Sequence, residues 1–161
     1  MKLLDDYLEK ETASLIEKNI KIIVSGNLEK LRESTKLAIS TIEEKTKNNT
    51  ALVLNVAFSY GSRQEIVDAT KQIALATSQG KISVDEISEE LFAKNLYHPE
   101  IPDPDLLIRT AGDMRISNFL LWQAAYAEFY FTEAYWPEFG KTDLLQAIKD
   151  FNKRERKYGK R

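Results

Sequence analysis

The chain has 161 residues, of which 43% are hydrophobic and 30% charged, so it is predicted to fold as one domain over residues 1–161 rather than stay disordered. The absence of cysteine excludes disulfides and thiolate zinc sites, and the single histidine argues against a Ser-His-Asp triad. No apolar run reaches the ~18 residues of a membrane helix, so the sequence predicts a cytoplasmic protein without a transmembrane segment. The net charge is −2, but residues 152–161 hold six basic residues against one acidic residue; the other residues therefore sum to −7, which argues against a nucleic-acid-binding surface.

The first half of the chain alternates helical and strand patterns. Apolar residues spaced as on one helix face predict helices over residues 2–19 and 28–47. The β-branched run at residues 20–24 and the apolar run at residues 51–58 predict strands, the second of them covered on both faces. A third helix is predicted from Ser62, which has capping-box spacing to Glu65, as far as Gly80.

The second half continues the alternation. Ser83 and Glu86 have the spacing of another capping box and predict a short helix to about residue 95, followed by an irregular, proline-rich connection over residues 97–104. Strands are predicted at residues 106–108 and 127–132, and Thr142 is predicted to cap a last helix ending near residue 157. This order of elements predicts an α/β fold with a parallel sheet flanked by helices.

In such folds ligands bind beyond the carboxyl ends of the strands, and the strand at residues 51–58 has one candidate site at its end. Gly61 allows a tight turn, and the backbone amides of the helix that follows can hold an anion near Arg63. The alternative is that Ser62 only caps the helix and Arg63 is solvated. The pattern leaves both open.

The strand at residues 106–108 has a second candidate site at its end. Arg109 leaves this strand, and Arg115 and Ser117 follow within nine residues of chain. Two guanidiniums and a hydroxyl can surround a diphosphate with charge-assisted hydrogen bonds. Alternatively, the two arginines pair with Asp105 and Asp113, and the spacing does not decide between these readings.

Glu128 lies inside an apolar and aromatic run, where a buried carboxylate needs a partner. Magnesium is chemically suited to this role, because Mg²⁺ is typically held by one or two carboxylates together with waters and phosphate oxygens. The alternative is an outward-facing glutamate on an alternating strand.

The run at residues 105–139, DLLIRTAGDMRISNFLLWQAAYAEFYFTEAYWPEF, closely resembles the C-terminal signature of the cis-prenyltransferases, the undecaprenyl diphosphate synthase family. Residues 55–66, NVAFSYGSRQEI, look like the upstream Tyr-Gly-x-Arg segment of that family. Residues 152–159, NKRERKYG, are similar to its closing motif. The resemblance therefore covers nearly the whole chain.

This resemblance implies a magnesium-dependent transferase that condenses isopentenyl diphosphate with an allylic diphosphate during polyprenyl diphosphate synthesis. It implies that Arg109 and Arg115 bind the diphosphate of isopentenyl diphosphate, assisted by Ser117 and the backbone of Ile116. Glu128 would hold Mg²⁺. Arg63, which matches the arginine of the Tyr-Gly-x-Arg segment, is a candidate for contacting or supporting a phosphate.

The family's Asp-Gly-Asn-Gly-Arg-Trp motif, whose aspartate serves magnesium binding and catalysis, has no match in the 161 residues. The expectation is therefore an N-terminally truncated cis-prenyltransferase-like domain that keeps the isopentenyl diphosphate half-site, contains none of the catalytic residues and is inactive alone. Loss of a strand also predicts an exposed apolar sheet edge and self-association.

The resemblance further implies a homodimer, whose basic C-terminal segment reaches the partner's diphosphate site, and a lipid product that draws the protein to the membrane surface. The alternative function is a non-catalytic partner subunit of a heteromeric cis-prenyltransferase. A small nucleotide-binding domain is disfavoured, because the glycine fingerprints of such domains are missing.

Overall fold

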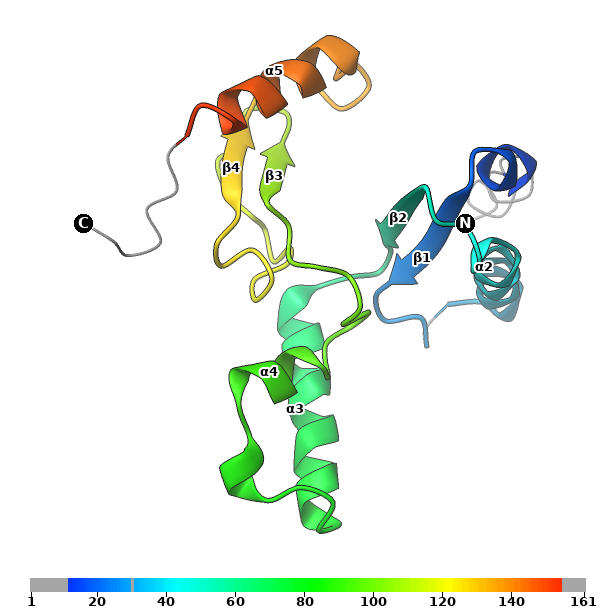
Figure 1. Cartoon of the computed structure of the whole chain (residues 1–161), viewed down its shortest axis with the longest axis vertical. Helices are drawn as coiled ribbons and strands as arrows, with labels where there is room; N and C mark the ends of the chain where they lie inside the picture. Colours follow the sequence, from blue (N-terminus) through cyan, green and yellow to red (C-terminus); the bar gives the residue numbers. More distant parts are fainter. Residues whose placement is uncertain (1–11, 30, 155–161) are drawn as a thin grey trace. The chain divides into compact units, whose positions relative to one another are not determined.

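The computed structural model describes residues 12–29 and 31–154, and its strands are parallel and flanked by helices, as predicted (Figure 1). The chain divides into two compact units, Met1–Pro99 and Glu100–Arg161. Within the described residues each unit holds one two-stranded parallel sheet. The α/β class predicted from the sequence is therefore confirmed.

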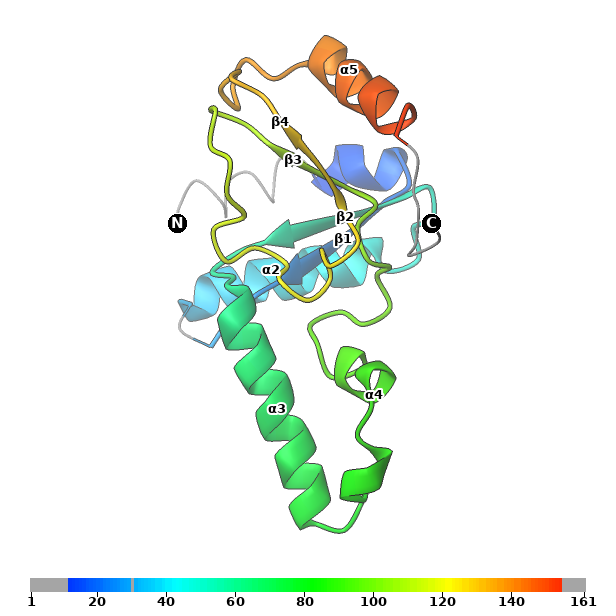
Figure 2. The same cartoon turned by 90° about the vertical axis from the view of Figure 1, so that its left-hand side faces the viewer.

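The first unit begins with a helical segment at residues 12–17 and continues with alternating strands and helices. Its further elements are β1 (Ile20–Ser25), α2 (Glu33–Thr46), β2 (Leu52–Ala57), α3 (Ser62–Ser78), the 3₁₀ turn η1 (Val84–Glu86) and α4 (Glu89–Ala93). The short α4 lies beside the long α3 (Figure 2).

The core of the first unit forms where α2 packs against β1 (Figure 1). Ile22 and Val24 of β1 and Ile39 and Ile42 of α2 make up one buried cluster, which accounts for the apolar face predicted for this helix. Thr46 closes the end of α2, because its buried hydroxyl accepts a hydrogen bond from the Ile22 N–H and donates one to the Ile42 carbonyl.

The predicted cover on both faces of the second strand is wrong. Leu52, Val53 and Leu54 of β2 are 55%, 47% and 44% exposed, although β2 pairs in register with β1 from Ile20↔Leu52 onward. The reason is that α2, the helix that packs on this sheet, lies against β1 rather than β2, whereas an inner strand of a parallel sheet is covered by helices on both faces.

The second unit contains β3 (Leu106–Arg109), β4 (Glu128–Phe131) and α5 (Lys141–Phe151). The two strands pair in parallel from Leu106↔Glu128 to Arg109↔Phe131, and α5 packs against β4. A long loop over residues 110–127 connects the strands, and it begins at the carboxyl end of β3.

Three helix starts test the predicted caps. The box at Ser83 is confirmed, since its N–H donates to Oε2 of Glu86 at 2.6 Å, although this box opens η1 rather than α4. The caps predicted at Ser62 and Thr142 are wrong, because glycines with extended backbone, Gly61 and Gly140, precede those helices.

The two ends of the chain are described only in part. Of the helix predicted over residues 2–19, residues 12–17 are helical and the residues before 12 lie outside the described part. The last helix ends at Phe151 rather than near Lys157, and Lys157 itself lies outside the described residues. Among the described residues, no helix combines the length and apolar character needed to cross a membrane.

Candidate functional site

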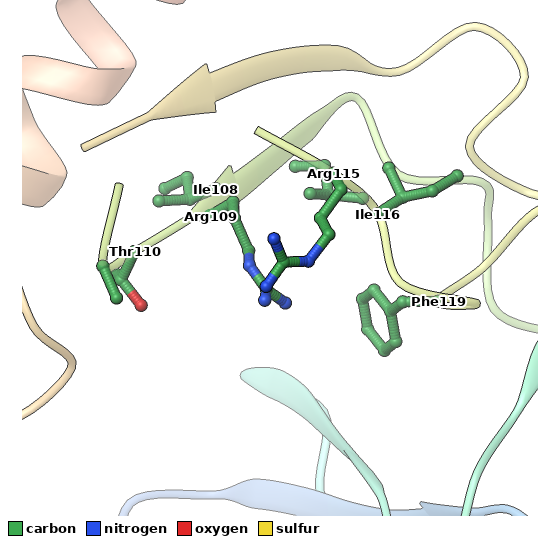
Figure 3. A pocket seen from close by; sticks show the side chains of 8 residues that line it. Ile108, Arg109, Thr110, Arg115, Ile116 and Phe119 are labelled. Atoms are coloured by element: carbon green, nitrogen blue, oxygen red, sulfur yellow. The ribbon is translucent and has the colours of Figure 1, made fainter. Parts of the chain in front are cut away.

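Arg109 and Arg115 come together at the carboxyl end of β3. Arg109 is the last residue of this strand and Arg115 belongs to the loop that follows, and both line a cavity of about 360 Å³ (Figure 3). Ile116 and Phe119 contribute apolar walls to the same cavity. The structure thus brings the two predicted arginines to one hollow, as the strand-end rule suggested.

One carboxylate lies between the two arginines. Nη2 of Arg109 and Nη2 of Arg115 both donate to the same oxygen, Oδ2 of Asp113, at 2.8 and 2.7 Å. The hydrogen bond from Arg109, with the positive charges of both guanidiniums, lowers the pKa of the Asp113 carboxyl below its ordinary value. The pairing with Asp113 that the sequence left as an alternative is therefore present, and it joins both arginines.

The loop that carries these residues has an unusual backbone. Ala111, Ser117, Asn118 and Leu120 all have positive φ, between 48° and 65°, a region that non-glycine residues rarely occupy. Such strain costs free energy and persists only where the surroundings impose it, often at binding sites. Ser117 is exposed and follows directly on the cavity-lining Ile116.

The turn before Asp113 is fixed to the segment after β4. The N–H of Ala111 donates to the carbonyl of Ala134, and the N–H of Gly112 to that of Thr132, both at 2.9 Å. Gly112 has φ +69°, and a Cβ at this position would lie 2.5 Å from Oε2 of Glu133. The positive φ favours glycine here, and a larger residue would also require the flexible Glu133 side chain to move.

Glu128 opens β4 with its side chain 29% exposed, and its partner is an arginine. Nη1 of Arg154 donates to Oε2 of Glu128 at 2.8 Å and to the carbonyl of Phe129 at 2.9 Å, while Nη2 donates to Asp150 at 2.9 Å. The hydrogen bonds to Glu128 and Asp150 raise the pKa of Arg154. Sequence reasoning missed this partner, which lies 26 positions away in the chain.

The donor set for a metal is sparse in the part of the chain that the structure describes, where no group of three or more His, Asp or Glu side chains could hold an ion. Glu128 fits magnesium only as a single carboxylate, with Oε2 engaged by Arg154. That donor set suits an ion held mainly by phosphate oxygens and water, as Mg²⁺ commonly is.

In the first unit, Arg63 is the second residue of α3, with its side chain exposed. Two positions further, Glu65 is 1% exposed and accepts a hydrogen bond from the N–H of Tyr97 at 2.9 Å and another from the hydroxyl of Tyr60. This buried carboxylate ties the first turn of α3 to the connection after α4. In the sequence Glu65 stood out only by its capping-box spacing to Ser62, which did not indicate this burial.

A second hollow, of about 630 Å³, lies in the first unit between the turn at Gly26 and the face of α3 that carries Asp68 and Lys71. These two side chains pair at 3.7 Å, and Tyr97 donates to Asp68 at 2.7 Å. The hollow contains none of the site residues predicted from the sequence.

Comparison with known proteins gives consistent matches. Residues 1–159 match the family described as "Putative undecaprenyl diphosphate synthase". The isoprenyl transferase of Rickettsia prowazekii is 54% identical over 162 residues, which cover all of this chain and 69% of that protein. The isoprenyl transferase of Bacillus thuringiensis is 46% identical over 159 residues, which cover 99% of this chain but 62% of that protein.

Two solved structures share the fold. Lavandulyl diphosphate synthase from Lavandula x intermedia, in complex with dimethylallyl diphosphate, gives a TM-score of 0.94 at 35% identity and covers 99% of this chain and 69% of its own. A probable undecaprenyl diphosphate synthase from Campylobacter jejuni gives 0.86 at 38% identity, over 99% of this chain and 72% of its own.

Proposed function

The chain belongs to the undecaprenyl diphosphate synthase family of cis-prenyltransferases, and from this premise we propose that it carries the isopentenyl diphosphate half-site of an isoprenyl transferase. The observation that supports this most directly is the convergence of Arg109 and Arg115 at the carboxyl end of β3. The reaction would join isopentenyl diphosphate to the allylic carbon of a prenyl diphosphate, as diphosphate leaves that carbon and a proton leaves isopentenyl diphosphate.

Arg109 and Arg115 would bind the diphosphate of isopentenyl diphosphate. Each guanidinium has five N–H donors, of which one is engaged by Asp113, so both retain donors for phosphate oxygens. The hydroxyl of Ser117 and the backbone of Ile116 would add hydrogen bonds from the strained loop, and the apolar wall formed by Ile116 and Phe119 suits the isopentenyl chain.

Glu128 would hold Mg²⁺, and Arg154 would orient its carboxylate through the hydrogen bond to Oε2. Bound Mg²⁺ would neutralise part of the charge of the diphosphate. Arg63 in the first unit is proposed to contact or support a phosphate, in the role implied by the family's Tyr-Gly-x-Arg segment.

The chain spans 62% of the length of the Bacillus relative and contains no Asp-Gly-Asn-Gly-Arg-Trp sequence. We therefore propose one cis-prenyltransferase-like domain that binds isopentenyl diphosphate but does not turn over as the 161-residue chain alone. A homodimer is proposed as well, and large exposed aromatics of the second unit support it, since Tyr126 is 86% and Trp136 74% exposed. The cytoplasmic location stays a prediction.

Isothermal titration of the 161-residue chain with isopentenyl diphosphate and Mg²⁺ tests the half-site. Arg109→Gln and Arg115→Gln should each weaken binding about tenfold or more, because each removes charge-assisted hydrogen bonds. Lys141→Gln, which removes the same charge from the exposed start of α5, should leave the affinity unchanged. Wild-type protein that fails to bind would contradict the half-site.

A prenyl-transfer assay with farnesyl and isopentenyl diphosphates tests the second part of the proposal, and turnover by the chain alone would contradict it. The alternative is a non-catalytic partner subunit, against which the presence of Arg109, Arg115 and Glu128 argues, since a subunit without a substrate site has no need of them. Co-purification with a full-length synthase, together with a higher rate of that synthase, would establish this alternative.

A further inference from the structure

Asp113 occupies the centre of the two-arginine site rather than its margin. Because Arg109 and Arg115 donate to the same Oδ2 atom, their Nη2 atoms lie no further apart than the two hydrogen bonds combined. Two guanidiniums this close repel each other unless an anion lies between them. In the protein by itself, the Asp113 carboxylate is that anion.

The position of this carboxylate is set by backbone. The two residues before it, Ala111 and Gly112, both have positive φ, and their N–H groups are bonded to the segment that follows β4. Asp113 therefore sits on a fixed turn. Arg115 is in contrast 66% exposed and has a long side chain with many rotamers, so the fixed residue orients the flexible one.

Asp113 also sets the charge of the site. With two arginines and one aspartate the cluster carries a net charge of about +1. A small anion that contacts only one guanidinium therefore gains little electrostatic binding free energy from the cluster. An anion long enough to contact both guanidiniums meets donors that are already held at a fixed spacing, and it does not have to order them on binding.

We propose that Asp113 is a positioning residue that holds Arg109 and Arg115 at the spacing of a diphosphate and thereby gives the site its preference for diphosphate over monophosphate. This inference rests on the proposed binding of a diphosphate at these arginines. It extends that proposal by naming the residue that pre-organises them.

The experiment compares inorganic diphosphate and inorganic phosphate by isothermal titration of the 161-residue chain. Asp113→Asn should lose about tenfold in diphosphate affinity and keep its phosphate affinity, so the preference falls by the same factor. Asp113→Glu, which retains the carboxylate, should recover most of the preference. Asp103→Asn removes the same charge from an exposed residue of the preceding connection and should change neither affinity.

A ligand-free measurement separates this inference from the proposed function. The guanidinium NMR signals of Arg109 and Arg115 should show slowed rotation in wild type and in Asp113→Glu, and free rotation in Asp113→Asn. Tighter or unchanged diphosphate binding by Asp113→Asn overturns the inference. Wild type that binds no diphosphate contradicts the proposed function and with it the preference, while the NMR signals still decide whether Asp113 positions the arginines.

Discussion

Tyr97 and Asp68 form a hydrogen-bonded pair that makes the first unit sensitive to pH. The Tyr97 hydroxyl donates to Oδ2 of Asp68 at 2.7 Å, and this hydrogen bond is the main reason why the pKa of Asp68 lies below its ordinary value of 3.8. The pKa of Tyr97 is raised above its ordinary value of 10.0, first by burial and then by its bond to Asp68. Each group therefore stabilises the other's native protonation state.

Tyr97→Phe should flatten the pH dependence of stability at both ends. The Asp68 contribution is present above pH 3.8 and is lost as the pH falls further, because its folded pKa is depressed. The Tyr97 contribution is present below pH 10.0 and is lost as the pH rises further, because its folded pKa is raised.

Urea unfolding across the pH range measures this effect, with Tyr126→Phe, an exposed tyrosine of the second unit, as the control. The free energy of unfolding of wild type and of the control should fall more steeply at both ends than that of Tyr97→Phe. Identical curves for all three proteins would show that the pair does not control the pH dependence.

At the residue scale the sequence brought Arg109 and Arg115 together and offered Asp113 as a neighbour, but it did not identify the partner of Glu128. Arg109 and Arg115 were placed together by the rule that ligand sites lie at strand ends, and the structure brings them together. Glu128 was expected to need a partner, and it has one, but Arg154 lies beyond a loop and a helix whose path the local pattern does not encode. Contacts between distant residues follow from tertiary packing, which a single sequence does not reveal.

At the element scale, Arg154 ties the end of α5 to β4. Its three hydrogen bonds reach one acceptor on α5, Asp150, and two on β4, Glu128 and the carbonyl of Phe129. Because the side chain of Arg154 is 33% exposed, solvent screens part of this interaction, and Arg154→Gln should cost about 1–2 kcal/mol of stability.

Thermal unfolding followed by circular dichroism can measure the loss. Lys149→Gln, on the exposed face of the same helix, removes an equal charge and should change the stability by less than about 0.5 kcal/mol. If the two variants unfold at the same temperature, Arg154 does not anchor the helix.

Strands were predicted more accurately than helix starts. All four predicted strands lie within a residue or two of their predicted ranges, because short runs of aliphatic, β-branched or aromatic residues bounded by polar and turn-forming residues favour strands. The caps at Ser62 and Thr142 failed, since serine and threonine suit several places in the first turn, and glycines just before them already had the extended backbone of a cap. Of the two capping boxes predicted from serine–glutamate spacing, only the one at Ser83 forms, with the Ser83 N–H donating to the Glu86 carboxylate.

At the scale of the whole molecule, the exposed side chains of β2 predict self-association. Leu52, Val53 and Leu54 are adjacent, apolar and exposed on a strand of a two-stranded sheet, a combination that favours edge-to-edge pairing. The wild-type chain should therefore sediment as species larger than the proposed dimer as its concentration rises, and Leu54→Lys should suppress these larger species.

Leu37→Lys is the matched control, because Leu37 is equally apolar and 68% exposed but lies on helix α2. It should leave association unchanged. Sedimentation velocity at several concentrations distinguishes the cases, and equal dissociation by both variants would mean that β2 is not the surface involved.

The pairing of neighbouring strands within each sheet has a consequence for biosynthesis. β1 pairs with β2 and β3 with β4, so each sheet consists of strands that follow one another along the chain. A nascent chain can therefore complete the β1–β2 sheet, with α2 packed on it, before β3 has left the ribosome. Synthesis would then proceed with this sheet formed and the arginine-bearing loop still to be translated.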